Sequence, residues 1–221
     1  MAEQHESQRT GLNELSTSVD NGEVDSGAIA QYYDQWAAAY DGNLRDWNYQ
    51  APKVGADLLH QDVPLDAKVL DAGCGTGLSG LALQALGYQH ITGVDISQAS
   101  IDLAKETNAY EALAQVDMQS LHLPYEANEF AGLQCVGVLT YVPDTGGILR
   151  EFCRVVQRRG LVVFTQRDDL FAQRNDAAAL KALEDEGLWA PISVSEPQPY
   201  LPENDDYGDK VHVIYCTFRV V

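Results

Sequence analysis

The stretch from position 69 to 77 restricts the fold of this chain more than any other part of its sequence. The apolar residues Val69-Leu70 lead directly into Asp71-Ala72-Gly73-Cys74-Gly75-Thr76-Gly77. Glycine adopts left-handed backbone conformations at little cost, so three alternate glycines predict a tight turn after a short strand. An apolar stripe at helical spacing follows over 78–86 and ends at Gly87. Open parallel sheets bind ligands at such turns, beyond the carboxyl ends of their strands.

Strands and helices alternate through the middle of the chain. Short apolar segments predict strands at 68–70, 90–94, 113–116, 130–136 and 161–164. Ser97 is a capping residue for a helix that carries Ile101 and Ala104, and apolar residues at helical spacing predict another helix over 148–156. This alternation is typical of a parallel sheet covered by helices on both faces.

The pattern changes toward the end of the sequence. A helix is predicted over 176–186, and strands at 192–194 and 212–218 follow without a helix between them. A stretch rich in proline and acidic residues separates these two strands and predicts an exposed loop. We therefore expect an α/β fold whose mostly parallel sheet ends in an antiparallel C-terminal strand.

The N-terminal region divides into two parts. Residues 1–27 are acidic and polar and lack apolar periodicity, so we expect a flexible tail. From there on, Ile29, Tyr33, Trp36 and Tyr40 recur at helical spacing and predict a helix over 28–41, and a second helix is expected to begin near Pro52. The sequence therefore predicts a tail over 1–27 and one folded domain over 28–221.

The charge of the chain limits its partners. Acidic residues number 33 against 14 lysines and arginines, which gives a formal net charge of −19. Such a surface repels phosphate backbones and anionic headgroups, so we expect neither nucleic acid nor a membrane as partner. No apolar run approaches the length of a membrane span, and the N-terminus lacks the pattern of a signal peptide. We expect a cytoplasmic protein that is a monomer or a weak dimer.

The cysteines and histidines do not indicate a metal site. The four cysteines form no Cys-x-x-Cys pair, and none has zinc-ligand spacing to a histidine. We therefore expect reduced thiols and no bound metal.

Two interpretations of the glycine turn compete. Gly75-Thr76-Gly77-Leu78-Ser79-Gly80 matches a dinucleotide fingerprint, and Asp95 lies 20 residues beyond Gly75, which would suit an NAD(P)-dependent oxidoreductase using Gly75, Gly77 and Gly80. The longer pattern begins at Asp71 and is favoured, because the Asp71 carboxylate would repel a pyrophosphate but suits a cationic amino-acid group. In addition, two helices are predicted before the first strand, whereas dinucleotide folds usually begin with that strand.

The combined motifs resemble the class I S-adenosylmethionine-dependent methyltransferases. The stretch 69–77 is similar to the first motif of this family, Gly93-Val94-Asp95-Ile96-Ser97 to its second-strand motif, and Val116-Asp117-Met118 to the segment that borders adenine. The stretch 130–144 is similar to the fourth-strand motif. More narrowly, Tyr33-Asp34-Gln35-Trp36-Ala37-Ala38-Ala39-Tyr40-Asp41 resembles the methyltransferase-like proteins named after the Williams–Beuren syndrome region.

The resemblance implies a Rossmann-like seven-stranded sheet and an enzyme with S-adenosylmethionine as cofactor. It implies that Asp95 accepts hydrogen bonds from the ribose hydroxyls, and that Asp71 acts on the methionine ammonium, unless it only stabilises the turn. The residues expected to bind the cofactor are Tyr33, Tyr40, Asp71, Gly73, Gly75, Gly77, Asp95, Ile96, Asp117, Met118 and Cys135.

The acceptor is less well defined than the cofactor. We expect a small molecule, methylated by direct displacement, with Tyr49, Tyr141 and Arg167 near it because they lie at or beyond strand ends. The sequence indicates no catalytic residue, since Thr140 stands where the family often has His or Glu. A noncatalytic module that binds S-adenosylmethionine is a further alternative.

Overall fold

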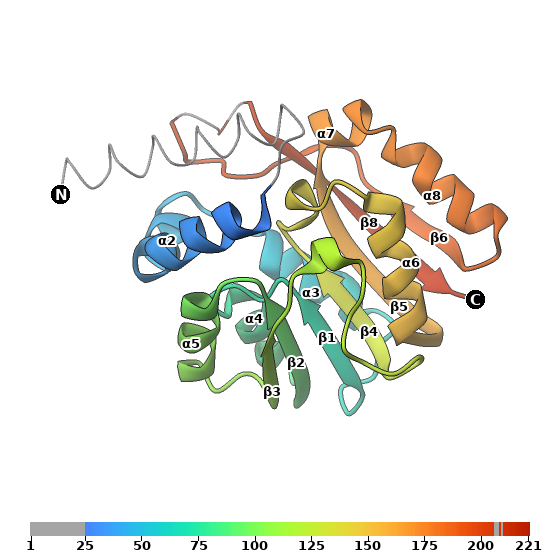
Figure 1. Ribbon diagram of the computed structural model, residues 1–221, viewed down its shortest axis with the longest axis horizontal. Helices are drawn as coiled ribbons and strands as arrows, with labels where there is room; N and C mark the ends of the chain where they lie inside the picture. The colour runs from blue at the N-terminus through green and yellow to red at the C-terminus, as the bar shows by residue number, and fades with distance from the viewer. Residues whose placement is uncertain (1–24, 206–207, 209) are drawn as a thin grey trace.

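One mixed sheet runs through the computed structural model, in the order β3-β2-β1-β4-β5-β8-β6 (Figure 1). The structure describes residues 25–205, 208 and 210–221, so the predicted tail lies almost wholly outside the described residues. The strands are β1 (Lys68–Ala72), β2 (His90–Asp95), β3 (Ala112–Gln115), β4 (Phe130–Cys135), β5 (Val156–Arg167), β6 (Trp189–Val194), β7 (Gln198–Pro199) and β8 (His212–Val220). The helices are α2 (Ser26–Asp46), α3 (Ala51–His60), α4 (Leu78–Leu86), α5 (Gln98–Glu106), α6 (Thr145–Val155), α7 (Asp168–Gln173) and α8 (Asp176–Asp185), with short 3₁₀ turns η1 (Met118–Ser120) and η2 (Leu139–Tyr141).

The strand directions confirm the predicted sheet. From β3 to β5 every neighbouring pair is parallel, and β8 is antiparallel to both β5 and β6. The chain proceeds from β1 toward β3 on one side and from β4 outward on the other, so the strand order reverses at β1 and β4. In open α/β sheets this reversal opens a crevice at the carboxyl ends of the strands, where ligands bind.

Side chains of β1 alternate between two cores because successive residues of a strand point to opposite faces. Val69 packs with Leu59 of α3 and Leu83 of α4 on one face. Leu70 belongs to the other core, which includes Phe152 of α6. The two-sided burial explains why the strands are short apolar runs rather than alternating ones.

Strands β5 and β6 begin earlier than the predicted strands at 161–164 and 192–194, and three other elements differ more. Helix α2 extends beyond 28–41, since the Asp25 carboxylate caps it by accepting from Ala28 N at 2.7 Å and its last turns bury Leu44. Helix α7 was not predicted, because its six residues carry little periodicity. Strand β7 pairs with β8 inside the stretch predicted to be a loop, so the sheet has eight strands rather than seven.

The helices occupy distinct regions around the sheet. Helix α2 lies beside α5 at the end of the sheet that carries β2 and β3, whereas α6, α7 and α8 gather around β5, β6 and β8 (Figure 1). Within the described part of the chain, no helix has both the length and the apolar character needed to cross a membrane.

Candidate functional site

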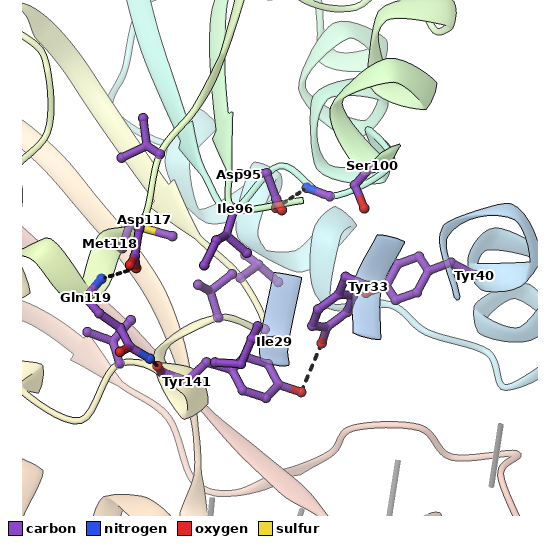
Figure 2. Close-up of a pocket in the computed structure, with 17 residues that line it drawn as sticks. Ile29, Tyr33, Tyr40, Asp95, Ile96, Ser100, Asp117, Met118, Gln119 and Tyr141 are labelled. Carbon is purple, nitrogen blue, oxygen red and sulfur yellow. Dashed lines mark hydrogen bonds between the residues drawn. The ribbon is translucent and has the colours of Figure 1, made fainter. Parts of the chain in front are cut away.

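A pocket opens beyond the carboxyl ends of β1, β2, β3 and β4, the edge of the sheet at which open α/β folds bind ligands. Helix α2 forms one of its sides, so the pocket lies between the sheet and the first described helix (Figure 2). The lining residues are Ile29, Tyr33, Tyr40, Gly73, Gly75, Asp95, Ile96, Ser100, Val116, Asp117, Met118, Gln119, Val136, Gly137, Val138, Tyr141 and Val142.

One wall of the pocket is made by the ends of β1, β2 and β3 and is called the strand-end wall; it comprises Gly73, Gly75, Asp95, Ile96, Asp117 and Met118. The Asp95 carboxylate accepts from Gly75 N at 2.8 Å and from Ser97 N at 2.9 Å. Burial raises the pKa of Asp95, and the backbone donors Ser97, Gly75 and Ile96 oppose this shift. The carboxylate is therefore held in one orientation by two consecutive strand-end turns.

The glycine turn requires glycine at Gly73 for two reasons. Its backbone is left-handed, with φ at +88°, and a Cβ there would lie 2.1 Å from Cγ2 of Val138. Gly73 N and Cys74 N both donate to Val94 O, at 2.7 and 2.9 Å, which fixes the turn to the end of β2. At Gly75, where φ is +51°, an added Cβ would meet nothing within 4 Å. The space beside Gly75 is thus open to a ligand.

The segment after β3 completes the strand-end wall. Asp117 caps η1 by accepting from Gln119 N at 2.8 Å, and Met118 is buried beside it. The side chain of Gln119 then reaches across, with Nε2 donating to Tyr141 O at 2.9 Å. Figure 2 shows this link between the strand-end wall and Tyr141.

The opposite wall carries phenol groups and is called the tyrosine wall; it comprises Tyr33, Tyr40 and Tyr141. The hydroxyls of Tyr33 and Tyr141 face each other, and Tyr33 donates to Tyr141 at 2.9 Å (Figure 2). Tyr33 also contacts the ring of Tyr40 edge to face, at a centroid separation of 6.1 Å. Burial raises the pKa of all three phenols, so they are uncharged at neutral pH.

Helix α2 is joined to two loops of the sheet by carboxylates. Asp34 accepts from Ser97 Oγ at 2.6 Å and from Ala99 N at 3.1 Å, at the start of α5. Asp41 accepts from Thr76 Oγ1 at 2.5 Å, in the glycine turn. Together with the Tyr33–Tyr141 contact, these hydrogen bonds hold α2 over the pocket.

Asp71 lies away from the pocket lining. Its side chain is fully buried, and it accepts from Tyr110 Oη at 2.7 Å and from Gln134 Nε2 at 3.3 Å. These partners are side chains, so Asp71 does not stabilise the turn through backbone amides as the alternative prediction had it. Burial raises the pKa of Asp71 to about 7. Asp71 points to the face of the sheet on which Tyr110 packs, beneath the turn.

Four other predicted residues also lie behind the lining. Gly77 is the N-cap of α4 and faces Thr107, and Cys135, at the end of β4, is buried in the core that includes Leu70 and Phe152. Tyr49 shares a hydrogen bond of 3.2 Å with Tyr200, and Arg167 pairs with Asp169. The structure therefore brings together Tyr33, Tyr40, Gly73, Gly75, Asp95, Ile96, Asp117, Met118 and Tyr141.

Several lining residues were not among the predicted cofactor-binding residues. Most lie within or beside the family motifs at 116–118 and 130–144, namely Val116, Gln119, Val136, Gly137, Val138 and Val142. Ile29 lies four residues before Tyr33, so helical spacing could have placed it on the same face of α2. No such signal marks Ser100, which lies inside α5 three residues after the capping Ser97.

None of the four cysteines lines the pocket. All four cysteines are free and buried, and burial raises the pKa of Cys74 and Cys135. Over residues 25–205, 208 and 210–221, no three His, Cys, Asp or Glu side chains gather into a metal-binding group.

Comparison with known proteins shows a methyltransferase domain. A family described as "Methyltransferase domain" matches residues 70–164. The human "Methyltransferase-like protein 27" is 31% identical over 164 residues, which are 72% of this chain and 66% of that protein. A "Ubiquinone biosynthesis O-methyltransferase" from Idiomarina loihiensis is 32% identical over 130 residues, 57% of this chain and 53% of that protein. The chain thus spans less than two thirds of the length of these relatives.

Solved structures share the fold at low sequence identity. The cyclase SpnF is 18% identical, with a TM-score of 0.67 over 88% of this chain and 96% of SpnF. A geranyl diphosphate C-methyltransferase from Streptomyces coelicolor A3(2), in complex with S-adenosyl-L-homocysteine, is 16% identical, with a TM-score of 0.58 over 75% of this chain and 78% of that enzyme. The Rossmann-like architecture of the sheet is therefore confirmed.

Proposed function

Because this chain belongs to the class I S-adenosylmethionine-dependent methyltransferases, we propose that it transfers the methyl group of S-adenosylmethionine to a small-molecule acceptor. The observation that carries this proposal is the strand-end wall, where Gly75, Asp95 and Asp117 from three successive strand ends line one pocket. The alternative interpretation, a dinucleotide site, relies on Gly80. A Cβ added at Gly80 would lie 2.2 Å from the Tyr110 ring, so packing against Tyr110 explains why this residue is glycine.

The strand-end wall fits the proposed cofactor. Open space beside Gly75 admits a ligand close to the backbone, and the fixed Asp95 carboxylate retains lone pairs for the ribose hydroxyls. Asp117 and Met118 offer a carboxylate and a thioether, which suit the amine and the ring face of adenine. When bound, S-adenosylmethionine supplies a methyl group already activated by a sulfonium, so direct displacement needs no enzyme-bound intermediate.

The contribution of the chain is alignment and exclusion of water. Helix α2, held by Asp34 and Asp41, covers the pocket from the solvent side. We assign Tyr141 to the acceptor end, and Tyr33 and Tyr40 to the cofactor beside it. Tyr49 and Arg167 stand behind this end. Burial raises the pKa of Tyr141, and the hydrogen bond from Tyr33 and the charge of Arg167 oppose this shift.

A concave pocket that α2 covers supports a small acceptor rather than a chain of protein or nucleic acid. The net charge of −19 also opposes contact with phosphate backbones. The uncharged phenols of the tyrosine wall donate hydrogen bonds and are poor bases, so the acceptor is expected to present an available lone pair.

Two measurements test the proposed function. Calorimetric titration is expected to detect binding of S-adenosylhomocysteine and none of NAD, and the reverse result would favour an oxidoreductase. The chain is then incubated with a cell extract and S-adenosylmethionine labelled in its methyl group. Label is expected in the low-molecular-weight fraction after ultrafiltration; label confined to macromolecules, or binding without transfer, would contradict the proposal.

A further inference from the structure

The backbone of η2 is held by side chains from outside the segment. Arg174, which lies between α7 and α8, donates to the carbonyl oxygens of Leu139 at 3.0 Å, Thr140 at 2.8 Å and Val142 at 3.2 Å. The remaining carbonyl, that of Tyr141, accepts from Gln119 Nε2 at 2.9 Å. Four consecutive carbonyl groups are thus satisfied by two side chains.

Few backbone hydrogen bonds of its own stabilise η2. Tyr141 N donates to Val138 O at 2.9 Å, and Val142 N donates to Leu139 O at 3.1 Å. A 3₁₀ turn this short has poor hydrogen-bond geometry and is readily distorted. Its conformation therefore depends on the contacts that Arg174 and Gln119 provide.

The placement of Arg174 follows from the turn between two helices. Arg174 ends α7, and Asn175 adopts a left-handed φ of +54° that redirects the chain into α8. The guanidinium is half-buried, and burial lowers the pKa of Arg174 while Asp176 opposes that shift. Asp176 is itself held by Gln166 Nε2 at 3.1 Å. A planar fork of five donors can serve three carbonyls together, which a lysine ammonium does less well.

The segment that Arg174 holds carries Tyr141 into the pocket. The Tyr141 ring contacts the Tyr33 ring edge to face at a centroid separation of 5.8 Å, and its hydroxyl accepts from Tyr33. A shift of η2 would move this hydroxyl and break its contact with α2. Arg174 itself is absent from the lining of the pocket.

We propose that Arg174 is a positioning residue for the acceptor end of the pocket: it fixes the carbonyl groups of η2 and thereby places the Tyr141 hydroxyl against Tyr33. The effect of Arg174 on methyl transfer rests on the proposed function, whereas its effect on the position of the Tyr141 hydroxyl does not.

The test uses 3-fluorotyrosine incorporated at position 141 alone, with its fluorine resonance as the readout. Arg174→Met is expected to shift and broaden this resonance, and Tyr33→Phe is the reference for a lost Tyr33–Tyr141 contact. Arg150→Met is the matched control, because Arg150 also donates to a backbone carbonyl, that of Gly146, but on α6. Arg174→Lys is expected to fall between wild type and Arg174→Met.

An unchanged resonance in folded Arg174→Met would overturn the proposal. Should Arg174→Met fail to unfold cooperatively, Arg174→Lys decides: an intermediate resonance supports the proposal and a wild-type resonance overturns it. S-adenosylhomocysteine affinity is expected to stay at the wild-type value in both variants. Methyl transfer is expected to fall about tenfold or more in Arg174→Met, because small misplacements far from the reacting atoms are costly. If the wild-type chain neither binds S-adenosylhomocysteine nor transfers methyl groups, the proposed function fails, while the fluorine resonance still decides the role of Arg174.

Discussion

The strand-end wall and the tyrosine wall face each other across one pocket but are built in different ways. The strand-end wall comes from turns that directly follow β1, β2 and β3, and its geometry is set by backbone groups such as Gly75 N and Ser97 N. The tyrosine wall joins Tyr33 of α2 to Tyr141 of η2, which are 108 residues apart in the sequence. Side-chain hydroxyls and distant supports such as Arg174 set its geometry.

This difference indicates which wall tolerates change. A wall made of backbone in left-handed conformations cannot accept a side chain without strain. A wall made of side chains on helices can lose one hydroxyl at the cost of one hydrogen bond. We therefore expect substitutions beneath or within the strand-end wall to have large effects, and substitutions in the tyrosine wall to have small ones.

The largest effect is expected beneath the strand-end wall, at Asp71. Its pKa of about 7 in the folded protein exceeds the ordinary value of 3.8. The folded state therefore binds the proton more tightly than the unfolded state. The stability associated with this group is fully present below pH 3.8 and is lost as pH rises through 7, amounting to about 4 kcal/mol.

Asp71→Asn is expected to remove this part of the pH dependence, which urea unfolding across the same pH range measures. The exposed Asp102→Asn is the control, since Asp102 has a pKa lowered by Lys105 and Gln98 rather than raised. Identical pH profiles for wild type and Asp71→Asn would contradict the expected shift.

The next effect separates two glycines within the strand-end wall. Gly73→Ala combines a left-handed backbone with a Cβ at 2.1 Å from Val138, and is expected to lower the free energy of unfolding by about 3 kcal/mol. Gly75→Ala meets no neighbour and is expected to cost about 1 kcal/mol through its backbone alone. Urea unfolding measures both. Equal losses would mean that the contact with Val138 relaxes freely.

The third prediction concerns the Asp95 carboxylate. Asp95→Ala removes the acceptor assigned to the ribose hydroxyls, and since such charged hydrogen bonds are worth roughly 1.5–3 kcal/mol, S-adenosylhomocysteine affinity is expected to fall at least about tenfold. Calorimetry measures the dissociation constant, with Asp102→Ala as the control on the exposed face of α5. An unaltered dissociation constant in Asp95→Ala would remove Asp95 from the cofactor site.

The smallest effect is expected in the tyrosine wall. Tyr33→Phe removes one hydroxyl and its hydrogen bond to Tyr141, worth about 1 kcal/mol, so methyl transfer is expected to fall about fivefold. S-adenosylhomocysteine affinity is expected to change far less than in Asp95→Ala. Tyr49→Phe is the matched control, because its hydroxyl bonds Tyr200 behind the lining. A loss in Tyr33→Phe as large as that in Asp95→Ala would abolish the distinction between the two walls.

Local patterns were enough to predict most of the secondary structure. The helix over 78–86 was predicted with its bounds, and Ser97 caps α5 by accepting from Ser100 N, as expected. These predictions succeed because capping, helical spacing and glycine turns are decided by neighbouring residues. Strand β7 and helix α7 were missed, since two and six residues hold too little periodicity to be recognised.

The sequence by itself determined the strand-end wall, because Asp95 ends a strand, Gly73, Gly75 and Asp117 lie just beyond strand ends, and parallel strands bring such ends to one edge of the sheet. Only the tertiary structure decided the other features of the site. In the tertiary structure Asp71 lies under the turn, because its hydrogen-bond partners Tyr110 and Gln134 come from distant segments of the chain. The tertiary structure also set Tyr141 against Tyr33 and placed Arg174 behind η2, because hydrogen bonds between segments far apart in the chain leave no periodic trace in the sequence.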